Sequence, residues 1–231
     1  MMKSKMKISD LENRIGIKFH KENLLKEALT HRSYINEKPN WRLPHNERLE
    51  YLGDAVLELA VTEKLFNKFP KEAEGKLTVL RAALVNYQML AKVAEEISLK
   101  DFILMSKGES KDGGKARDVI LANAIEALIG AIYLDQGFSV ASHFINVFIV
   151  KHLNEILENE SYRDPKSKLQ EITQEKFKVT PTYKVLDEIG PAHDRIFKVG
   201  VYFDKKLAAE GSGTSKQEAE TEAATRALEQ F

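Results

Sequence analysis

The stretch Glu47-Arg48-Leu49-Glu50-Tyr51-Leu52-Gly53-Asp54-Ala55-Val56-Leu57 decides how this chain of 231 residues is interpreted. It opens a segment, 47–68, whose apolar residues recur at helical spacing, so it predicts an amphipathic helix. The acidic residues Glu47, Glu50 and Asp54 follow one another at intervals of three and four, which places their carboxylates on one helix face. Like charges about 5 Å apart repel by about 3 kcal/mol at an effective dielectric of 20, so this face calls for a cation.

Oxygen ligands favour magnesium as that cation, with manganese as a possible substitute. Zinc is disfavoured because the chain has no cysteine and no pair of histidines at ligand spacing beside these acids. Three acids at helical spacing, taken alone, are also typical of a solvated helix face that binds nothing. The acidic spacing by itself therefore leaves both interpretations open.

The sequence on both sides of this segment, from residue 8 to about 157, has the apolar period of helices. A second helix is expected over 76–97 and a third over 117–134, and their apolar stripes predict one shared core. The stripes are Leu49, Leu52, Val56 and Leu59 in the first helix, Leu77, Leu80 and Leu84 in the second, and Leu121, Ala124, Leu128 and Ile132 in the third.

The pattern changes after residue 157, where a polar segment precedes short stretches rich in β-branched and aromatic residues. We expect helices over 166–177 and 215–228 and strands over 182–189, 195–203 and 207–210. Asp204-Lys205 suits a turn between the last two strands, and Ser215 with Glu218 resembles a capping box. The prediction is a helical domain over 1–157, a linker over 158–164 and a small α+β domain over 165–231.

Composition narrows the class of protein without identifying a partner. Hydrophobic residues make up 43% and charged residues 30%, which predicts a folded globular chain. No stretch approaches the length of about 18 apolar residues that a membrane span needs, so a cytoplasmic location with no membrane partner is expected. Lys and Arg number 35 and Asp and Glu number 35, so the net charge gives no sign of a nucleic-acid partner.

The segment 47–57 resembles the signature of the ribonuclease III family and matches it at every position. The resemblance extends to Ala28-Leu29-Thr30-His31-Arg32-Ser33-Tyr34, to Glu74-Gly75 with Leu80-Arg81-Ala82, and to Ile120-Leu121-Ala122-Asn123-Ala124-Ile125-Glu126-Ala127-Leu128-Ile129-Gly130-Ala131. It implies an all-α endonuclease domain followed by an α-β-β-β-α double-stranded-RNA-binding domain. It also implies a homodimer that cleaves double-stranded RNA in rRNA and mRNA processing and decay, with no organic cofactor.

By the same resemblance, Glu50, Asp54 and Glu126 would hold the catalytic divalent metals, with Asp54 and Glu126 as catalytic residues. Glu47 and Glu74 would line the same acidic cleft. The implied chemistry is metal-assisted hydrolysis, with staggered cuts that leave 5′ phosphates, 3′ hydroxyls and short 3′ overhangs.

Asn123 departs from the family pattern, which usually has Asp at this position. An amide oxygen can still ligate a hard cation, but it brings no negative charge and cannot act as a base. Weaker metal binding is expected, and the alternative function is a duplex-RNA-binding protein with an impaired nuclease site. A helical metal phosphohydrolase that acts on small nucleotides is a third hypothesis, which the C-terminal module disfavours.

The C-terminal segment resembles a double-stranded-RNA-binding domain in three regions: Pro165-Lys166-Ser167-Lys168-Leu169-Gln170-Glu171, Gly190-Pro191-Ala192-His193 and Ser215-Lys216. The RNA-binding residues implied are Lys168, Gln170, His193, Ser215 and Lys216. A lysine at a helix N-terminus favours a phosphate there, and A-form RNA is contacted mainly through phosphates and 2′-hydroxyls. Gln217 replaces a usual second basic residue, so reduced affinity for RNA is expected.

Overall fold

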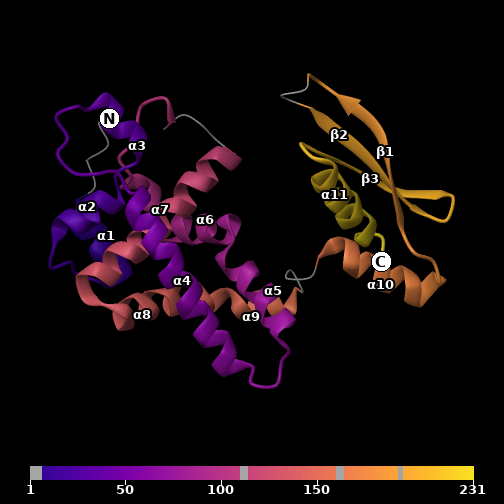
Figure 1. Ribbon diagram of the computed structural model, residues 1–231, viewed down its shortest axis with the longest axis horizontal. Coiled ribbons are helices and arrows are strands. Elements are labelled where there is room, and N and C mark those ends of the chain that lie inside the picture. Colours follow the sequence, from indigo (N-terminus) through magenta and orange to yellow (C-terminus); the bar gives the residue numbers. More distant parts are fainter. Residues whose placement is uncertain (1–6, 110–113, 160–163, 192–194) are drawn as a thin grey trace. The chain divides into compact units, whose positions relative to one another are not determined.

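The computed structural model describes the chain except for residues 1–6, 110–113, 160–163 and 192–194. The chain divides into two compact units, Met1–Tyr162 and Arg163–Phe231 (Figure 1). The first unit is built of helices, and the second combines two helices with a three-stranded sheet. The expected helical domain followed by a small α+β domain is confirmed. The linker bounds 158–164 stay a prediction, because part of that segment lies outside the described residues.

The first unit contains α1 (Ile8–Ile15), α2 (Glu22–Ala28), α3 (Arg32–Glu37), α4 (Glu47–Lys68), α5 (Glu74–Val85), α6 (Tyr87–Glu96), α7 (Lys115–Gln136), α8 (Phe138–Phe148) and α9 (Leu153–Glu158). Two short 3-10 turns, η1 (Leu99–Asp101) and η3 (Val150–His152), lie between helices. Along the described helices, none combines the length and apolar character that crossing a bilayer requires.

Helix α7 lies at the centre of the first unit's core. Its predicted stripe is fully buried, with Leu121 at 1% exposure and Ala124, Leu128 and Ile132 at 0%. Residues on its other faces, such as Ile125 and Ile129, are buried as well. The buried apolar residues lie on several faces of the helix because α2, α4, α6 and α8 all pack against it.

The expected helix over 76–97 is two helices, α5 and α6, which meet at Asn86. Asn86 has an extended backbone, and its side-chain oxygen accepts a hydrogen bond from the Met89 backbone N–H at 2.9 Å. It therefore acts as the N-cap of α6. The apolar period continues across this break without Gly or Pro, so the sequence pattern did not reveal it.

Helix α4 also differs from its predicted stripe. Leu49 and Val56 are buried, but Leu59 is 57% exposed, and the inner face continues through Leu57 and Leu65 instead. The shift follows from the packing, because α4 contacts α5 and α8 as well as α7. Its outer face is left with exposed apolar side chains, which include Tyr51 at 83% and Phe66 at 68%.

The second unit has the order α10 (Pro165–Phe177), β1 (Thr182–Ile189), β2 (Ile196–Phe203), β3 (Lys206–Gly213) and α11 (Lys216–Leu228). The strands form one antiparallel sheet with the order β1-β2-β3, and β2 pairs with both neighbours. Val201 of β2 packs with Leu169 of α10 and with a row of alanines of α11, Ala223, Ala224 and Ala227. The helices thus cover one face of the sheet (Figure 1).

Strand β3 runs three residues beyond the predicted end at Glu210. The extension contains Gly211 and Gly213, which weaken a strand prediction. A Cβ atom on Gly211 would lie 2.2 Å from the Ala223 backbone nitrogen, so the glycine is needed for close packing of α11 on the strand. Asp204 adopts a left-handed conformation with φ of 56° in the predicted turn.

The start of α11 keeps half of the predicted capping box. The Ser215 hydroxyl accepts a hydrogen bond from the Glu218 backbone N–H at 3.1 Å. The Glu218 carboxylate accepts from the backbone N–H of Thr214, at 2.9 Å, instead of from that of Ser215. The cap is therefore present, with the reciprocal bond displaced by one residue.

Candidate functional site

The candidate site is built on the crossing of α4 and α7, where glycines allow the two backbones to touch. A Cβ atom on Gly53 of α4 would lie 1.7 Å from the carbonyl oxygen of Glu126 in α7. A Cβ atom on Gly130 of α7 would lie 2.2 Å from the carbonyl oxygen of Leu49 in α4. Only glycine fits at either position without movement of the backbone.

This crossing brings polar side chains from the two helices together. On α4, Glu50 lies about one turn before Gly53 and Asp54 directly follows it, and Asn123 and Glu126 lie one helical turn apart on α7. Glu50, Asn123 and Glu126 are half-buried, and Asp54 is exposed. Residues 69 or more positions apart in the sequence therefore share one site.

The electrostatics confirm that these carboxylates interact. Burial and, to a smaller extent, the negative charges of Asp54 and Glu50 together raise the pKa of Glu126 to about 7. Burial also raises the pKa of Glu50, and the charges of Glu47 and Asp54 act in the same direction. A hydrogen bond with the Asn123 side chain lowers the Glu50 pKa in part. The site gathers negative charge that a cation would relieve.

The side chains of the site, as they lie in the structure, do not surround a single metal position. Within the described part of the chain, no three His, Asp or Glu side chains stand in an arrangement that would ligate one ion together. The donor set of carboxylate and amide oxygens nevertheless suits a hard divalent cation.

Glu47 lies at the first turn of α4 with two basic partners. Its carboxylate is 3.5 Å from the Arg32 guanidinium and 3.8 Å from Nδ1 of His45. It is one of the charges that act on Glu50, so it belongs to the acidic cluster. Arg32 lies in a segment that resembles the family, but its pairing with Glu47 could not be predicted from their positions in the sequence.

Glu74 opens α5 and is exposed. Its carboxylate accepts a hydrogen bond from the Thr78 hydroxyl at 2.9 Å. It is not among the charges that shift the pKa of Glu50 or Glu126. The described geometry thus joins Glu47 to the cluster but leaves the role of Glu74 as a prediction.

Four of the five predicted RNA-binding residues lie at or near the N-termini of the two helices of the second unit. Lys168 and Gln170 lie in the first turns of α10, Ser215 caps α11, and Lys216 is its first residue. Gln170 borders a hollow of about 330 Å³ between α10 and α11. His193 lies outside the described residues. The sequence analysis missed Glu188, which pairs with Lys216, because that contact is a long-range one.

Comparison with known proteins agrees with this arrangement of a helical unit with an acidic site and a small α+β unit. A ribonuclease-III-like family model matches residues 21–153, and a double-stranded RNA binding motif matches residues 165–231. Ribonuclease 3 of Desulforamulus reducens is 44% identical over 229 residues, which cover 99% of this chain and 93% of that protein. Ribonuclease 3 of Enterococcus faecalis is 46% identical over 220 residues, or 95% of each chain.

A solved structure resembles the first unit. The nuclease domain of ribonuclease III from Campylobacter jejuni is 49% identical with a TM-score of 0.57, and the match covers 63% of this chain and 97% of that one. The fold and the site define a two-domain nuclease. The chain belongs to the ribonuclease III family, whose members are endoribonucleases.

Proposed function

We propose that this chain is a metal-dependent endonuclease of double-stranded RNA, with magnesium as the cation and manganese as a substitute. The observation that carries the proposal is the α4–α7 crossing, which holds Glu50, Asp54 and Glu126 in one negatively charged site. The double-stranded RNA binding motif over residues 165–231 supplies the substrate class. The family match supports dependence on a divalent metal.

Each residue has a distinct part in this proposal. Glu50, Asp54, Asn123 and Glu126 would offer oxygen atoms to the cation, and Asp54 and Glu126 would adjoin the scissile phosphate. When bound, divalent cations supply an activated water and stabilise charge on the leaving 3′ oxygen. Glu126 must lose its proton to become a ligand, because its pKa is about 7 in the free site. Products with 5′ phosphates and 3′ hydroxyls follow from such hydrolysis.

The proposal includes a homodimer that cuts both strands and leaves short 3′ overhangs. Tyr51, Leu59 and Phe66 are exposed and lie seven or eight residues apart, so they share one face of α4. Large exposed apolar side chains on one helix face are typical of a protein interface. The Campylobacter jejuni structure describes a region of its nuclease domain that is involved in dimer formation. A twofold pair would place one acidic site on each RNA strand.

The alternative function, duplex binding with an impaired nuclease, rests on Asn123. A magnesium titration of long-duplex cleavage separates the two functions when it compares the natural chain with Asn123→Asp and Glu126→Gln. The natural chain is expected to cleave, and Asn123→Asp to need about tenfold less magnesium because it restores one negative ligand. Glu126→Gln is expected to cleave about a thousandfold more slowly.

The matched control is Glu63→Gln, a neutralised exposed carboxylate farther along α4, which is expected to cleave normally. Cleavage by Asn123→Asp alone would favour the binding-only function. If none of these proteins cut the duplex at any magnesium concentration, the proposed enzyme function would be wrong.

A further inference from the structure

Glu188, at the end of β1, holds two basic side chains of the second unit. Its Oε2 atom lies 2.9 Å from Nη1 of Arg195, which precedes β2, and its Oε1 atom lies 3.7 Å from Nζ of Lys216. Lys216 also lies over the ring of Phe197, at 5.6 Å from the ring centre. One carboxylate thus joins the β1–β2 connection to the first residue of α11.

The contact is open to solvent on all three side chains. The exposed fraction is 37% for the Glu188 side chain, 42% for that of Arg195 and 59% for that of Lys216. An external anion can therefore reach both cations without unfolding of the unit. The first turn of α11 adds its own preference for an anion, because free backbone N–H groups and the helix dipole point there.

A carboxylate and a phosphate are alternative partners for the same donors. Both present anionic oxygens, and both bind guanidinium and ammonium groups through charge-assisted hydrogen bonds. An RNA phosphate that contacts Lys216 must therefore displace Glu188 or accept its repulsion. The Glu188 carboxylate therefore competes with RNA phosphate for the contact that the proposed function assigns to Lys216.

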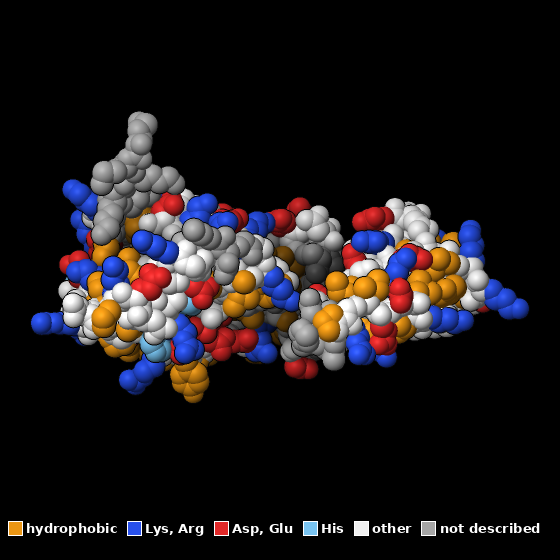
Figure 2. Space-filling model, turned by 90° about the horizontal axis from the view of Figure 1, so that it is seen from above, with side chains coloured by type: hydrophobic (Ala, Val, Ile, Leu, Met, Phe, Trp, Pro, Cys, Tyr) orange, Lys and Arg blue, Asp and Glu red, His pale blue; other side chains and the backbone are white. Residues whose placement is uncertain are grey.

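The rest of the unit shows why one carboxylate matters. From residue 161 onward there are twelve Lys and Arg against twelve Asp and Glu, so the unit carries no net positive charge. Figure 2 shows blue and red side chains interspersed over the visible face of this unit. Several of its cations are paired within the unit: Lys166 with Glu220, Lys198 with Glu210, and Arg226 with Glu222. Affinity for RNA thus depends on how readily individual pairs open.

We propose that Glu188 is an internal competitor of RNA phosphate, which occupies Arg195 and Lys216 in the free protein and limits the affinity of the second unit for duplex RNA. This inference rests on the proposed function. It assigns a role in RNA binding to Glu188 and Arg195, and it makes the strength of that binding a property of an acidic residue.

The test measures binding of the full chain to a labelled RNA duplex by fluorescence anisotropy. Magnesium is left out so that the duplex is not cleaved. Glu188→Gln is expected to bind about two- to fivefold more tightly at low salt, the range that an exposed ion pair allows. The gain should shrink as salt is raised above about 0.15 M, because screening weakens the competing charge.

The matched control is Glu210→Gln, which changes the net charge by the same amount. Glu210 pairs with Lys198 on the sheet, at a position whose strand partner is Gly200, away from the face that α10 and α11 cover. Its affinity is expected to match that of the natural chain. An equal gain in both variants would overturn the proposal, because net charge alone would then explain it.

A double substitution tests whether the effect of Glu188→Gln on RNA binding depends on Lys216. In a Lys216→Met background, the gain from Glu188→Gln should fall, since one of the two released cations is gone. Unchanged or weaker binding by Glu188→Gln would overturn the proposal and indicate that Glu188 orients Arg195 and Lys216 instead. Failure of the natural chain to bind duplex RNA at all would contradict the proposed function itself, a result distinct from either of these.

Discussion

The acidic site of the nuclease unit and the basic residues of the RNA-binding unit differ in how their charges are balanced. In the nuclease unit, the charges that act on Glu126 are both negative, Asp54 and Glu50, and the site is partly removed from water. In the RNA-binding unit, basic side chains are balanced by acidic neighbours, as Lys216 and Arg195 are by Glu188. The acidic site of the first unit keeps an excess of negative charge, whereas these basic side chains of the second unit already have an acidic partner.

The difference indicates what each unit requires of a ligand. A site with excess negative charge gains free energy from any cation of suitable size, so its binding is an addition. A surface of internal ion pairs must exchange one anion for another, so its binding is a substitution. Under the proposed function, the same principle of neutralisation predicts metal dependence in one unit and modest RNA affinity in the other.

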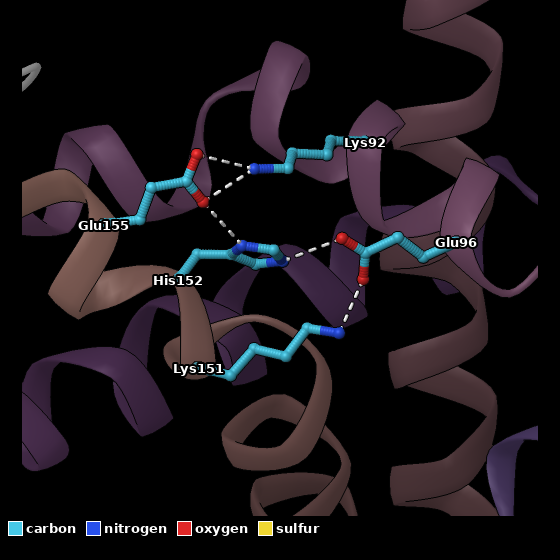
Figure 3. Close-up of polar contacts among 5 residues, drawn as sticks. All are labelled: Lys92, Glu96, Lys151, His152 and Glu155. Carbon is cyan, nitrogen blue, oxygen red and sulfur yellow. Dashed lines mark hydrogen bonds and ion pairs between the residues drawn. The ribbon is translucent and has the colours of Figure 1, made fainter.

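A region of the nuclease unit away from the acidic site shows the paired arrangement again (Figure 3). The buried His152 of η3 lies between Glu96 of α6, at 3.2 Å, and Glu155 of α9, at 3.3 Å. Lys151 pairs with Glu96 at 2.6 Å, and Lys92 pairs with Glu155 at 2.8 Å. The imbalance at the acidic site is therefore not a general property of this unit.

The largest expected effect comes from separation of the helices that hold the negative charges. In Gly53→Ala, the added methyl carbon would lie 1.7 Å from the carbonyl oxygen of Glu126, so α4 and α7 must move apart. We expect a loss of about 3 kcal/mol in the free energy of unfolding and a drop of more than a hundredfold in duplex cleavage. Urea denaturation and the cleavage assay measure the two effects.

Gly75→Ala is the matched control, because a Cβ atom on Gly75 of α5 would meet nothing within 4 Å. Gly75 is the second residue of α5, so helix propensity predicts a gain in stability below the roughly 0.5–1 kcal/mol of a helix interior, with normal cleavage. Similar behaviour of the two alanine variants would show that the backbone contact at Gly53 does not hold the site together.

The next effect concerns the pH dependence of stability without metal. The pKa of Glu126 is raised from 4.5 to about 7, so between these values the folded chain holds a proton that the unfolded chain has lost. This stabilisation is fully present below pH 4.5 and is lost as the pH rises through 7. After allowance for partial solvent exposure, we expect about 1–2 kcal/mol between pH 5 and pH 8.

Thermal unfolding across this pH range, with and without magnesium, measures the effect. Magnesium should stabilise the protein more at pH 8 than at pH 6, because it binds the ionised carboxylate. Glu126→Gln should remove most of both trends, and Glu63→Gln should keep them. The same pH profile in both variants would show that Glu126 is not the group responsible.

The smallest expected effect comes from removal of a carboxylate that is already paired, that of Glu96. Glu96→Gln leaves the buried His152 without one of its two carboxylate neighbours and also breaks the pair with Lys151. A loss of about 1 kcal/mol in the free energy of unfolding is expected, with cleavage unchanged. The change should have no metal-dependent component. A dependence on magnesium would break the contrast between the acidic site and the paired region.

Much of the fold could be predicted because its patterns are local. The bounds of α4 and β1 match the predicted segments 47–68 and 182–189, since apolar spacing and β-branched residues specify them directly. The break at Asn86 was missed because its cap depends on one side-chain hydrogen bond inside a continuous apolar period. The exposure of Leu59 was missed because the packing of α4 depends on several neighbouring helices.

The candidate site was predictable in its residues but not in its construction. The motifs named Glu50, Asp54 and Glu126, and the metal-binding role of each stays a prediction. What the sequence could not give was the contact of Gly53 with the Glu126 carbonyl, because spacing along one helix says nothing about how closely another approaches. The pairing of Glu188 with Lys216 was hidden for the same reason.

The glycine crossing has a consequence for protein engineering. The closest approach at the crossing is between backbone atoms, and the polar side chains beside it are half-buried or exposed, so they can be exchanged without changing that approach. A designer could therefore vary Asn123 and its neighbours to alter the choice of ion while leaving the scaffold intact. The two glycines themselves offer no such latitude, so libraries directed at this region should hold them fixed.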